Sequence, residues 1–279
     1  MTRYSFKIFC VAFSACFCCA GSLLAEDNNP HTDKMMNEKL NLTQEWDKVF
    51  PKSDKVTHRK VSFCNRYGIM LAADLYMPRN VNGKLPAIAV SGPFGAVKEQ
   101  SAGLYAQTMA ERGFLTIAFD PSYTGESGGF PRYVASPDIN TEDFCAAVDY
   151  LSTRDDVDSE RIGIIGICGW GGMAVNAAAI DTRIKATVTS TMYDMSRVNA
   201  NGYFDAMDAD ARYELRKQLN AQRTADAKSG SYALAGGVCQ ENPFDFLRSL
   251  PGFLHVGKNG LLASVHAGIN QIAGVSLNQ

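Results

Sequence analysis

The chain has little excess charge of either sign and few histidines. Its 27 lysines and arginines nearly balance 29 aspartates and glutamates, which gives a formal net charge of −2 over 279 residues. It has no basic stripe or arm, so nucleic-acid binding is not expected. The four histidines lie at positions 31, 58, 255 and 266, which leaves few places for an imidazole base.

Short paired cysteine spacings are lacking outside the first 19 residues. Eight cysteines occur, and four of them lie in the N-terminal apolar stretch, which leaves Cys64, Cys145, Cys168 and Cys239. None of these four has a Cys-x-x-Cys partner, which disfavours a redox-active dithiol. We predict no disulfide framework, no zinc or other metal site, and no organic cofactor.

An export signal is predicted over residues 1–25. Arg3 and Lys7 precede an almost unbroken apolar stretch over residues 8–24, and a small residue then precedes an acidic pair. At about 17 residues the stretch is near the lower limit for crossing a bilayer, so cleavage is favoured over a transmembrane anchor. We expect a periplasmic or secreted protein that meets a membrane only through this segment. A lipoprotein anchored at Cys16 is the alternative.

Strand-like and helix-like patterns alternate between residues 56 and 228. Residues 26–55 precede them as a polar leader, expected to be mobile apart from a short helix around residues 42–49. The strand patterns 56–63 and 69–76 flank a turn and predict a β-hairpin. Further strands are expected over residues 86–90, 114–119, 161–167 and 184–191, and helices over 98–112, 142–153 and 171–180. The alternation predicts one α/β domain with a mostly parallel, doubly wound sheet and helices on both faces.

The last part of the chain departs from this pattern. Residues 204–228 form a long helical stretch of mixed charge, which fits either a lid over the strand ends or an outer amphipathic helix. Residues 229–279 hold only four charged side chains, and no order of strands and helices is readable there. We therefore treat residues 229–279 as an atypical tail outside the regular pattern.

Residues 162–172 predict a nucleophile held on a sharp turn. An apolar strand runs into Cys168, glycines flank this cysteine, and helix-forming residues follow at once. Strand, tight turn and helix together form the arrangement of a nucleophile elbow. The N–H groups and dipole of the helix start are expected to favour the thiolate and to lower the pKa of Cys168. The alternative is a structural cysteine that packs as a small hydrophobe.

Four blocks of sequence resemble the α/β-hydrolase superfamily. The resemblance is closest to its dienelactone-hydrolase-like and Xaa-Pro dipeptidyl-peptidase-like branch, which includes polyketide-transferase-type hydrolases. It extends over roughly residues 60–195, and the four blocks are residues 68–78, 91–95, 119–127 and the elbow. Asp120, Glu126 and Ser127, in the third block, are interpreted as structural residues of a loop that shapes the edge of the sheet.

The resemblance places the nucleophile at Cys168, where most relatives have serine and dienelactone hydrolases have cysteine. It implies an oxyanion hole made by the backbone N–H of Gly169 and an N–H from the loop after strand 86–90, where Phe94 is the expected donor and Gly95 the second choice. Trp170 replaces a residue that is usually small. We expect its side chain to point away from the strand and to wall one side of a substrate pocket.

The acid and base that the resemblance implies are harder to place. No late strand ending in aspartate and no clear histidine loop are found. His266 is the candidate base, with His255 as the other choice, and Asp194 after strand 184–191 is the candidate acid or else a cap of the next segment. The tail is similar to that of a family member whose C-terminal part has been lost or replaced, for example by truncation or a frame shift.

Two functions follow from these observations. The first is an exported hydrolase or acyltransferase that uses a cysteine nucleophile on a small ester, lactone or thioester. The second is a catalytically incomplete α/β-hydrolase remnant, a pseudoenzyme or binder of a small acyl compound. The sequence sets no oligomeric state, and the partner it predicts is a small acyl substrate.

Overall fold

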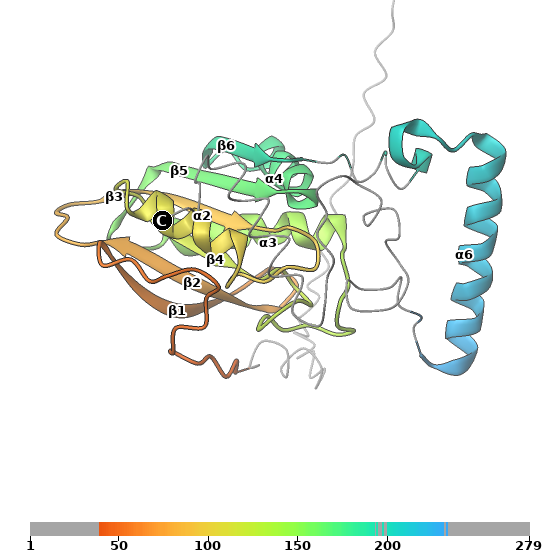
Figure 1. The fold of residues 1–279 in the computed structure, drawn as a ribbon, viewed down its shortest axis with the longest axis horizontal. Coiled ribbons are helices and arrows are strands. Elements are labelled where there is room, and N and C mark those ends of the chain that lie inside the picture. Colours follow the sequence, from red (N-terminus) through yellow and green to blue (C-terminus); the bar gives the residue numbers. More distant parts are fainter. Residues whose placement is uncertain (1–38, 193, 195–196, 198–199, 232, 234–279) are drawn as a thin grey trace, which may run out of the picture.

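The computed structural model describes residues 39–192, 194, 197, 200–231 and 233. Six strands form one sheet in the order β1-β2-β4-β3-β5-β6 (Figure 1). The strands are β1 Val56–Cys64, β2 Met70–Pro78, β3 Leu85–Ser91, β4 Leu115–Phe119, β5 Val157–Ile167 and β6 Ile184–Ser190. The helices that cover the sheet are α2 Ser101–Ala110, α3 Pro137–Ser152 and α4 Gly169–Ile180.

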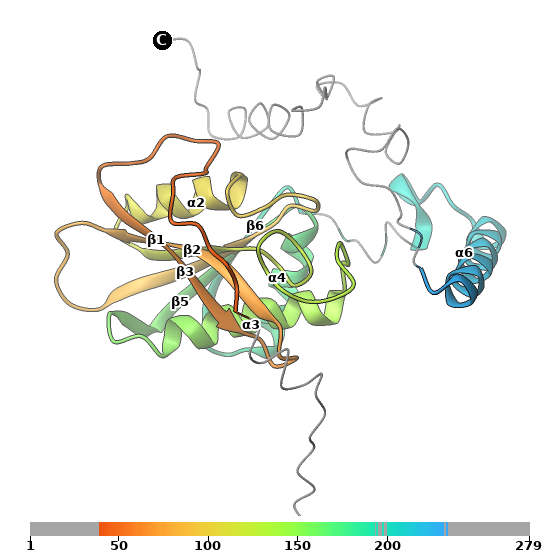
Figure 2. The same ribbon diagram turned by 90° about the horizontal axis from the view of Figure 1, so that it is seen from below.

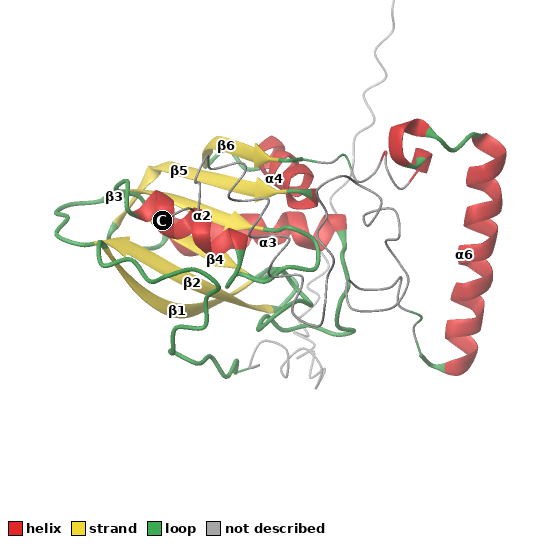
Figure 3. Cartoon of the chain, in the orientation of Figure 1, coloured by secondary structure: helices red, strands yellow, loops and turns green. Residues whose placement is uncertain are grey.

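The predicted α/β architecture is confirmed, with a mixed sheet. Strands β3, β4, β5 and β6 run parallel, whereas β1 pairs antiparallel with β2, and β2 pairs antiparallel with β4. The predicted hairpin is therefore the antiparallel extension of a parallel sheet. Because the parallel strands point the same way, their carboxyl ends and the loops that follow lie along one edge (Figure 3). In open α/β sheets this edge carries the ligand site.

Helices cover both faces of the sheet, as Figure 2 shows for α2 on one side and α3 on the other. Side chains alternate between the two faces along a strand, so successive residues pack into two different hydrophobic clusters, one on each face of the sheet. Leu75 and Ile164 pack in the cluster that holds residues of α3 and α4, whereas their neighbours Tyr76 and Ile165 pack against the alanines of α2. Burial on both faces explains why the strands are almost wholly apolar.

Two predicted helices differ from those observed. Helix α3 begins at Pro137, five residues before the expected start, because a proline at the first helical position follows Ser136 in an extended conformation. The helix expected around residues 42–49 is absent from the described chain. Instead the segment lies against the sheet, where Lys48 and Phe50 are buried. Its contacts with the sheet replace the local hydrogen bonds of a helix.

The long helix α6, Ala209–Ser229, stands apart from the sheet in both views (Figures 1 and 2). Asp208 caps its start by accepting a hydrogen bond from the backbone of Ala211, and Gly230 ends it with a positive φ. None of its residues is buried. Both proposed roles, lid and outer helix, therefore stay predictions.

The predicted export signal and most of the atypical tail fall outside the described residues. Of the residues that are described, none belongs to a helix with the length and apolar character that a membrane crossing requires. Export and the attachment of a lipid at Cys16 stay predictions.

Truncating Phe144 tests the core between the sheet and α3. Phe144 is fully buried and packs edge-on against Phe119, with 5.2 Å between ring centroids. We expect Phe144→Ala to lower the free energy of unfolding by about 3–5 kcal/mol in urea titrations, since it leaves a large cavity. Phe130, which is 80% exposed, is the control. Phe130→Ala should change stability by no more than about 0.5 kcal/mol, and equal effects of both variants would contradict this core.

Candidate active site

Cys168 lies between β5 and α4 in the conformation of a sharp turn. Its backbone has a φ of 58° and a ψ of −127°, a positive φ that non-glycine residues seldom adopt. The turn is held by two hydrogen bonds. The Cys168 N–H donates to the Ser190 carbonyl at 2.8 Å, and the Gly171 N–H donates to the Cys168 carbonyl at 3.0 Å. The predicted bend between strand and helix is therefore present.

Two glycines allow the chain to pack closely around this turn. A Cβ on Gly166 would lie 2.3 Å from the Trp170 carbonyl oxygen, so glycine lets the helix start sit directly on the strand. A Cβ on Gly169 would lie 1.8 Å from the ring of Phe94. The Phe94 ring thus covers the backbone of the residue after Cys168, and it brings the loop after β3 against the elbow.

The backbone N–H groups of Gly169 and Phe94 lie near the Cys168 sulfur, where they act to lower the pKa of the thiol. These are the two residues that the sequence predicts as oxyanion donors. An acyl carbon bonded to this sulfur would place its oxygen within reach of the same two amides. Donors aimed in advance at a developing negative charge are the largest single contribution in many acyl-transfer enzymes.

The pKa of Cys168 is raised, which contradicts the sequence-based expectation of a lowered value. Burial raises the pKa of the thiol above its ordinary value of 9.0, and the hydrogen bonds from Gly169 and Phe94 only partly offset this. The helix start does supply an amide, but the sulfur is partly buried and has lost much of its hydration. At neutral pH the group is a thiol, and it needs a base to become a nucleophile.

Trp170 packs inside the protein, and only 3% of the residue is exposed. Its ring meets Phe94 edge-to-face, with 4.4 Å between centroids. The Trp170 ring therefore packs against the loop after β3 and supports it. Its indole Nε1 is buried and has no hydrogen-bond partner among the described residues.

The candidate acid Asp194 is exposed, and its carboxylate accepts a hydrogen bond from the backbone N–H of Arg197 at 2.9 Å. This is the contact of a cap on the segment that follows. The candidate bases His266 and His255 lie outside the described residues. The remaining described histidine, His58, is buried: its side chain is 3% exposed, and Nε2 lies 2.8 Å from Asp74. The buried Asp74 carboxylate requires such a partner.

A lysine–carboxylate cluster, which the sequence analysis missed, lies beside the loops at the same edge of the sheet. The side chains of its three lysines have no exposed surface. Its members are Lys48, Lys60, Lys98, His58, Asp47, Asp74, Glu99, Asp120 and Glu126. One signal was available in the sequence: Asp74 is a lone charge in the apolar strand β2, and it pairs in register with Lys60 of β1.

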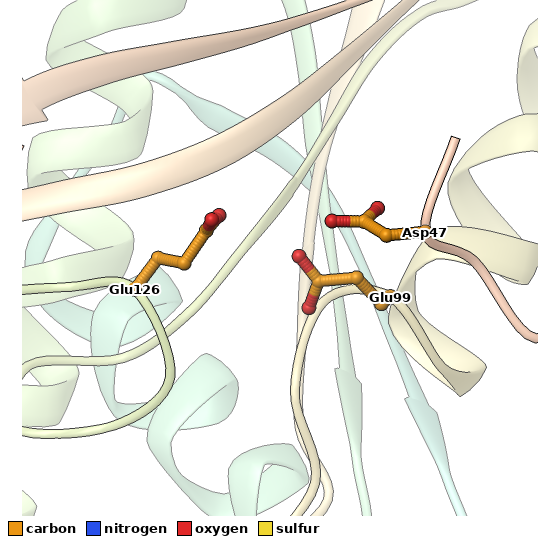
Figure 4. Close-up of side chains that lie close together, drawn as sticks. All are labelled: Asp47, Glu99 and Glu126. Atoms are coloured by element: carbon orange, nitrogen blue, oxygen red, sulfur yellow. The ribbon is translucent and has the colours of Figure 1, made fainter. Parts of the chain in front are cut away.

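Three carboxylates of this cluster point toward one another and have the spacing of metal ligands (Figure 4). Oxygen atoms of Asp47, Glu99 and Glu126 all lie within 4.8 Å of one another. The Lys60 ammonium, however, lies 2.6 Å from Asp47, 3.3 Å from Glu99 and 2.8 Å from Glu126. Each of these carboxylates is therefore paired with a lysine ammonium group, and the group is explained as an ion-pair cluster.

Alkylation by iodoacetamide tests the state of the Cys168 thiol. Thiolate is the reacting form, so the alkylation rate rises as the pH passes through the pKa. We expect the midpoint for Cys168, followed by mass spectrometry of its peptide, to lie above 9.0, the ordinary value for the thiol. N-acetylcysteine in the same buffers is the reference. A midpoint below that of the reference would show that the pKa of Cys168 is lowered and would contradict the raised value.

Comparisons with known proteins agree with this geometry. PA2218, an uncharacterized protein of Pseudomonas aeruginosa, is 68% identical over 212 residues, which are 73% of this chain and 57% of that protein. Its crystal structure matches with a TM-score of 0.69 at 66% identity, over 73% of this chain and 66% of that one. The α/β hydrolase GrgF from Penicillium sp. sh18 shares the fold, with a TM-score of 0.53 at 20% identity over 79% of this chain and 68% of that one.

A fungal relative carries a name that refers to an activity. The thiohydrolase aneE of Aspergillus aculeatus is 32% identical over 137 residues, which are 49% of this chain and 42% of that protein. The chain thus spans about half the length of the curated relatives it matches. Residues 67–242 match the X-Pro dipeptidyl-peptidase (S15) family. With its sheet, its elbow and this match, the chain belongs to that family of α/β hydrolases.

Proposed function

We propose that this protein transfers acyl groups from a small thioester to water or another acceptor, with Cys168 as the nucleophile. One observation carries the proposal: the sulfur lies on a positive-φ turn between β5 and α4, and the loop that carries Phe94 packs directly against this turn at Gly169. A structural cysteine does not require a strained backbone or two convergent amides.

The reaction proceeds through a covalent intermediate. The sulfur attacks the acyl carbonyl carbon, a new C–S bond forms, and the bond to the leaving thiol breaks. The proton of the Cys168 thiol passes through a base to the leaving thiol. Because the pKa of Cys168 is raised, this base must act during the attack. Water then attacks the acyl-enzyme and releases the acid.

The name of the Aspergillus relative supports a thioester as the substrate. The candidate base is His266, which lies outside the described residues. The predicted export signal also lies outside them. A small substrate is proposed because the Phe94 ring already covers the elbow on the side of the loop after β3.

The second candidate is a protein that binds small acyl compounds without turnover. One observation favours it. Within the described residues the candidate acid caps a neighbouring segment, and His58 is paired with Asp74 away from the elbow. Binding of a thioester with no release of thiol is the result that distinguishes this candidate.

Hydrolysis of an acetyl thioester and of p-nitrophenyl acetate tests the proposal. We expect Cys168→Ala to lower kcat/KM by at least about 10²-fold, since it removes the nucleophile. Cys64→Ala is the matched control, because Cys64 is an exposed free thiol away from the elbow. This control should retain the rate of the unmodified chain. Equal rates for Cys168→Ala and the unmodified chain would defeat the proposed function.

A further inference from the structure

The loop between β3 and α2, residues 92–100, carries one of the two amides that face Cys168. Its local hydrogen bonds are short-range turns, from Ala96 N–H to the Pro93 carbonyl at 3.2 Å and from Gln100 N–H to the Val97 carbonyl at 3.0 Å. These bonds shape the loop but do not attach it to the rest of the fold. The position of the Phe94 amide therefore depends on contacts with other elements.

One such contact is the buried carboxylate of Asp120, directly after β4. Its Oδ1 accepts the Lys98 backbone N–H at 2.8 Å, and its Oδ2 accepts the Lys98 ammonium at 2.9 Å. The same Oδ2 also accepts the Glu126 N–H at 2.9 Å. Both Asp120 and Lys98 are almost completely buried. One carboxylate thus binds one lysine through its backbone and its side chain together.

Asp120 is itself fixed to the sheet. Its N–H donates to the Ala72 carbonyl of β2 at 2.9 Å, and its carbonyl accepts the Ser127 hydroxyl at 2.7 Å. Burial raises its pKa above the ordinary value, against the opposing effect of Lys98. The carboxylate accepts from the Lys98 ammonium and from two backbone N–H groups, which is the environment of an ionised carboxylate.

Three contacts hold the loop 92–100. The Phe94 ring packs on Trp170 and over Gly169, and Lys98 is bound by Asp120. At the end of the loop, the Glu99 carbonyl accepts the Val49 N–H at 3.2 Å, and the Glu99 carboxylate lies 3.3 Å from the Lys60 ammonium. Between Phe94 and Lys98 lies Gly95, which is exposed and has a φ of 71°. Packing of a ring leaves a loop free to slide, whereas a two-point bond to a fixed carboxylate sets its position.

We propose that Asp120 and Lys98 are positioning residues of the candidate active site, and that their two-point bond holds the Phe94 amide against the Cys168 sulfur. The part of this inference that concerns catalysis rests on the proposed function. Its structural content, a loop fixed by a buried carboxylate, is measurable without turnover. Neither residue touches the sulfur in this assignment.

The test compares Asp120→Asn with Asp143→Asn in the full chain. Asp143 is the matched control, because it is a buried carboxylate that binds Ser122, Asn140 and Asn65 and makes none of its bonds to the loop 92–100. Both variants lose a buried charge and are expected to lower the melting temperature. Measurements are made well below the lower of the two melting temperatures.

Two readouts separate positioning from simple destabilisation. Hydrogen–deuterium exchange of the peptide covering residues 92–100 should become faster in Asp120→Asn and stay unchanged in Asp143→Asn. The pH midpoint of Cys168 alkylation should move upward by about one pH unit in Asp120→Asn alone, since one hydrogen bond to a thiolate is lost.

With a thioester as substrate, kcat of Asp120→Asn should fall with little change in KM. Lys98→Met, which keeps the backbone bond, should give the same changes to a smaller extent and serves if Asp120→Asn does not fold.

The outcomes distinguish this inference from the proposed function. If the two aspartate variants show the same exchange and the same midpoint, the positioning role is wrong, even where the unmodified chain hydrolyses thioesters. If the unmodified chain has no activity, but Asp120→Asn alone changes exchange and midpoint, the proposed function fails and the positioning role stands.

Discussion

The backbone conformation at Cys168 is the constraint on which the candidate site depends. A positive φ at a non-glycine residue costs of order 1–3 kcal/mol and persists only where the surrounding structure imposes it. Here it is imposed from both sides, because β6 accepts the Cys168 N–H through Ser190 and α4 returns a hydrogen bond to the Cys168 carbonyl. The turn directs the sulfur toward the loop after β3, where the Phe94 amide meets it. A relaxed turn would separate the sulfur from both donors.

Buried carboxylates organise the loops at this edge of the sheet. Asp120 binds the loop that carries Phe94, and Asp143 joins α3 to Ser122 and to the β1–β2 turn through Asn65. Buried ion pairs seldom add net stability, because taking the charges out of water is costly. What they provide in this protein is a defined geometry for these loops. The lysine–carboxylate cluster extends the same principle to the segment before β1, which it attaches through Lys48 and Asp47.

Much of this architecture was predictable from sequence because its signals are local. Apolar strands alternating with helices predicted the α/β sheet, and the glycines around Cys168 predicted the elbow. The pattern around Phe94 also pointed to a residue whose ring packs against the elbow. The acid and base were not predictable in the same way, because they depend on which loops meet in space. The lysine–carboxylate cluster was missed because its members come from five separate segments and become partners only on folding.

The raised pKa of Cys168 was also beyond sequence reasoning. The pattern indicated a helix start, which favours a thiolate, but gave no measure of how far the sulfur is buried. Burial and amide hydrogen bonds act in opposite directions, and their balance is a property of the packed structure. Under the proposed function, a raised pKa requires a base that removes the thiol proton during the attack.

The central claim, that the Cys168 sulfur accepts an acyl group at the elbow, is tested most directly by rapid acid quenching of the full chain mixed with an acetyl thioester. Intact-mass measurement followed by peptide mapping then locates any acetyl group. The account predicts one acetyl group on the peptide containing Cys168, and none on that peptide in Cys168→Ala. Acetylation elsewhere to the same extent, or no acetylated Cys168 at any quench time while thioester is being consumed, would contradict it.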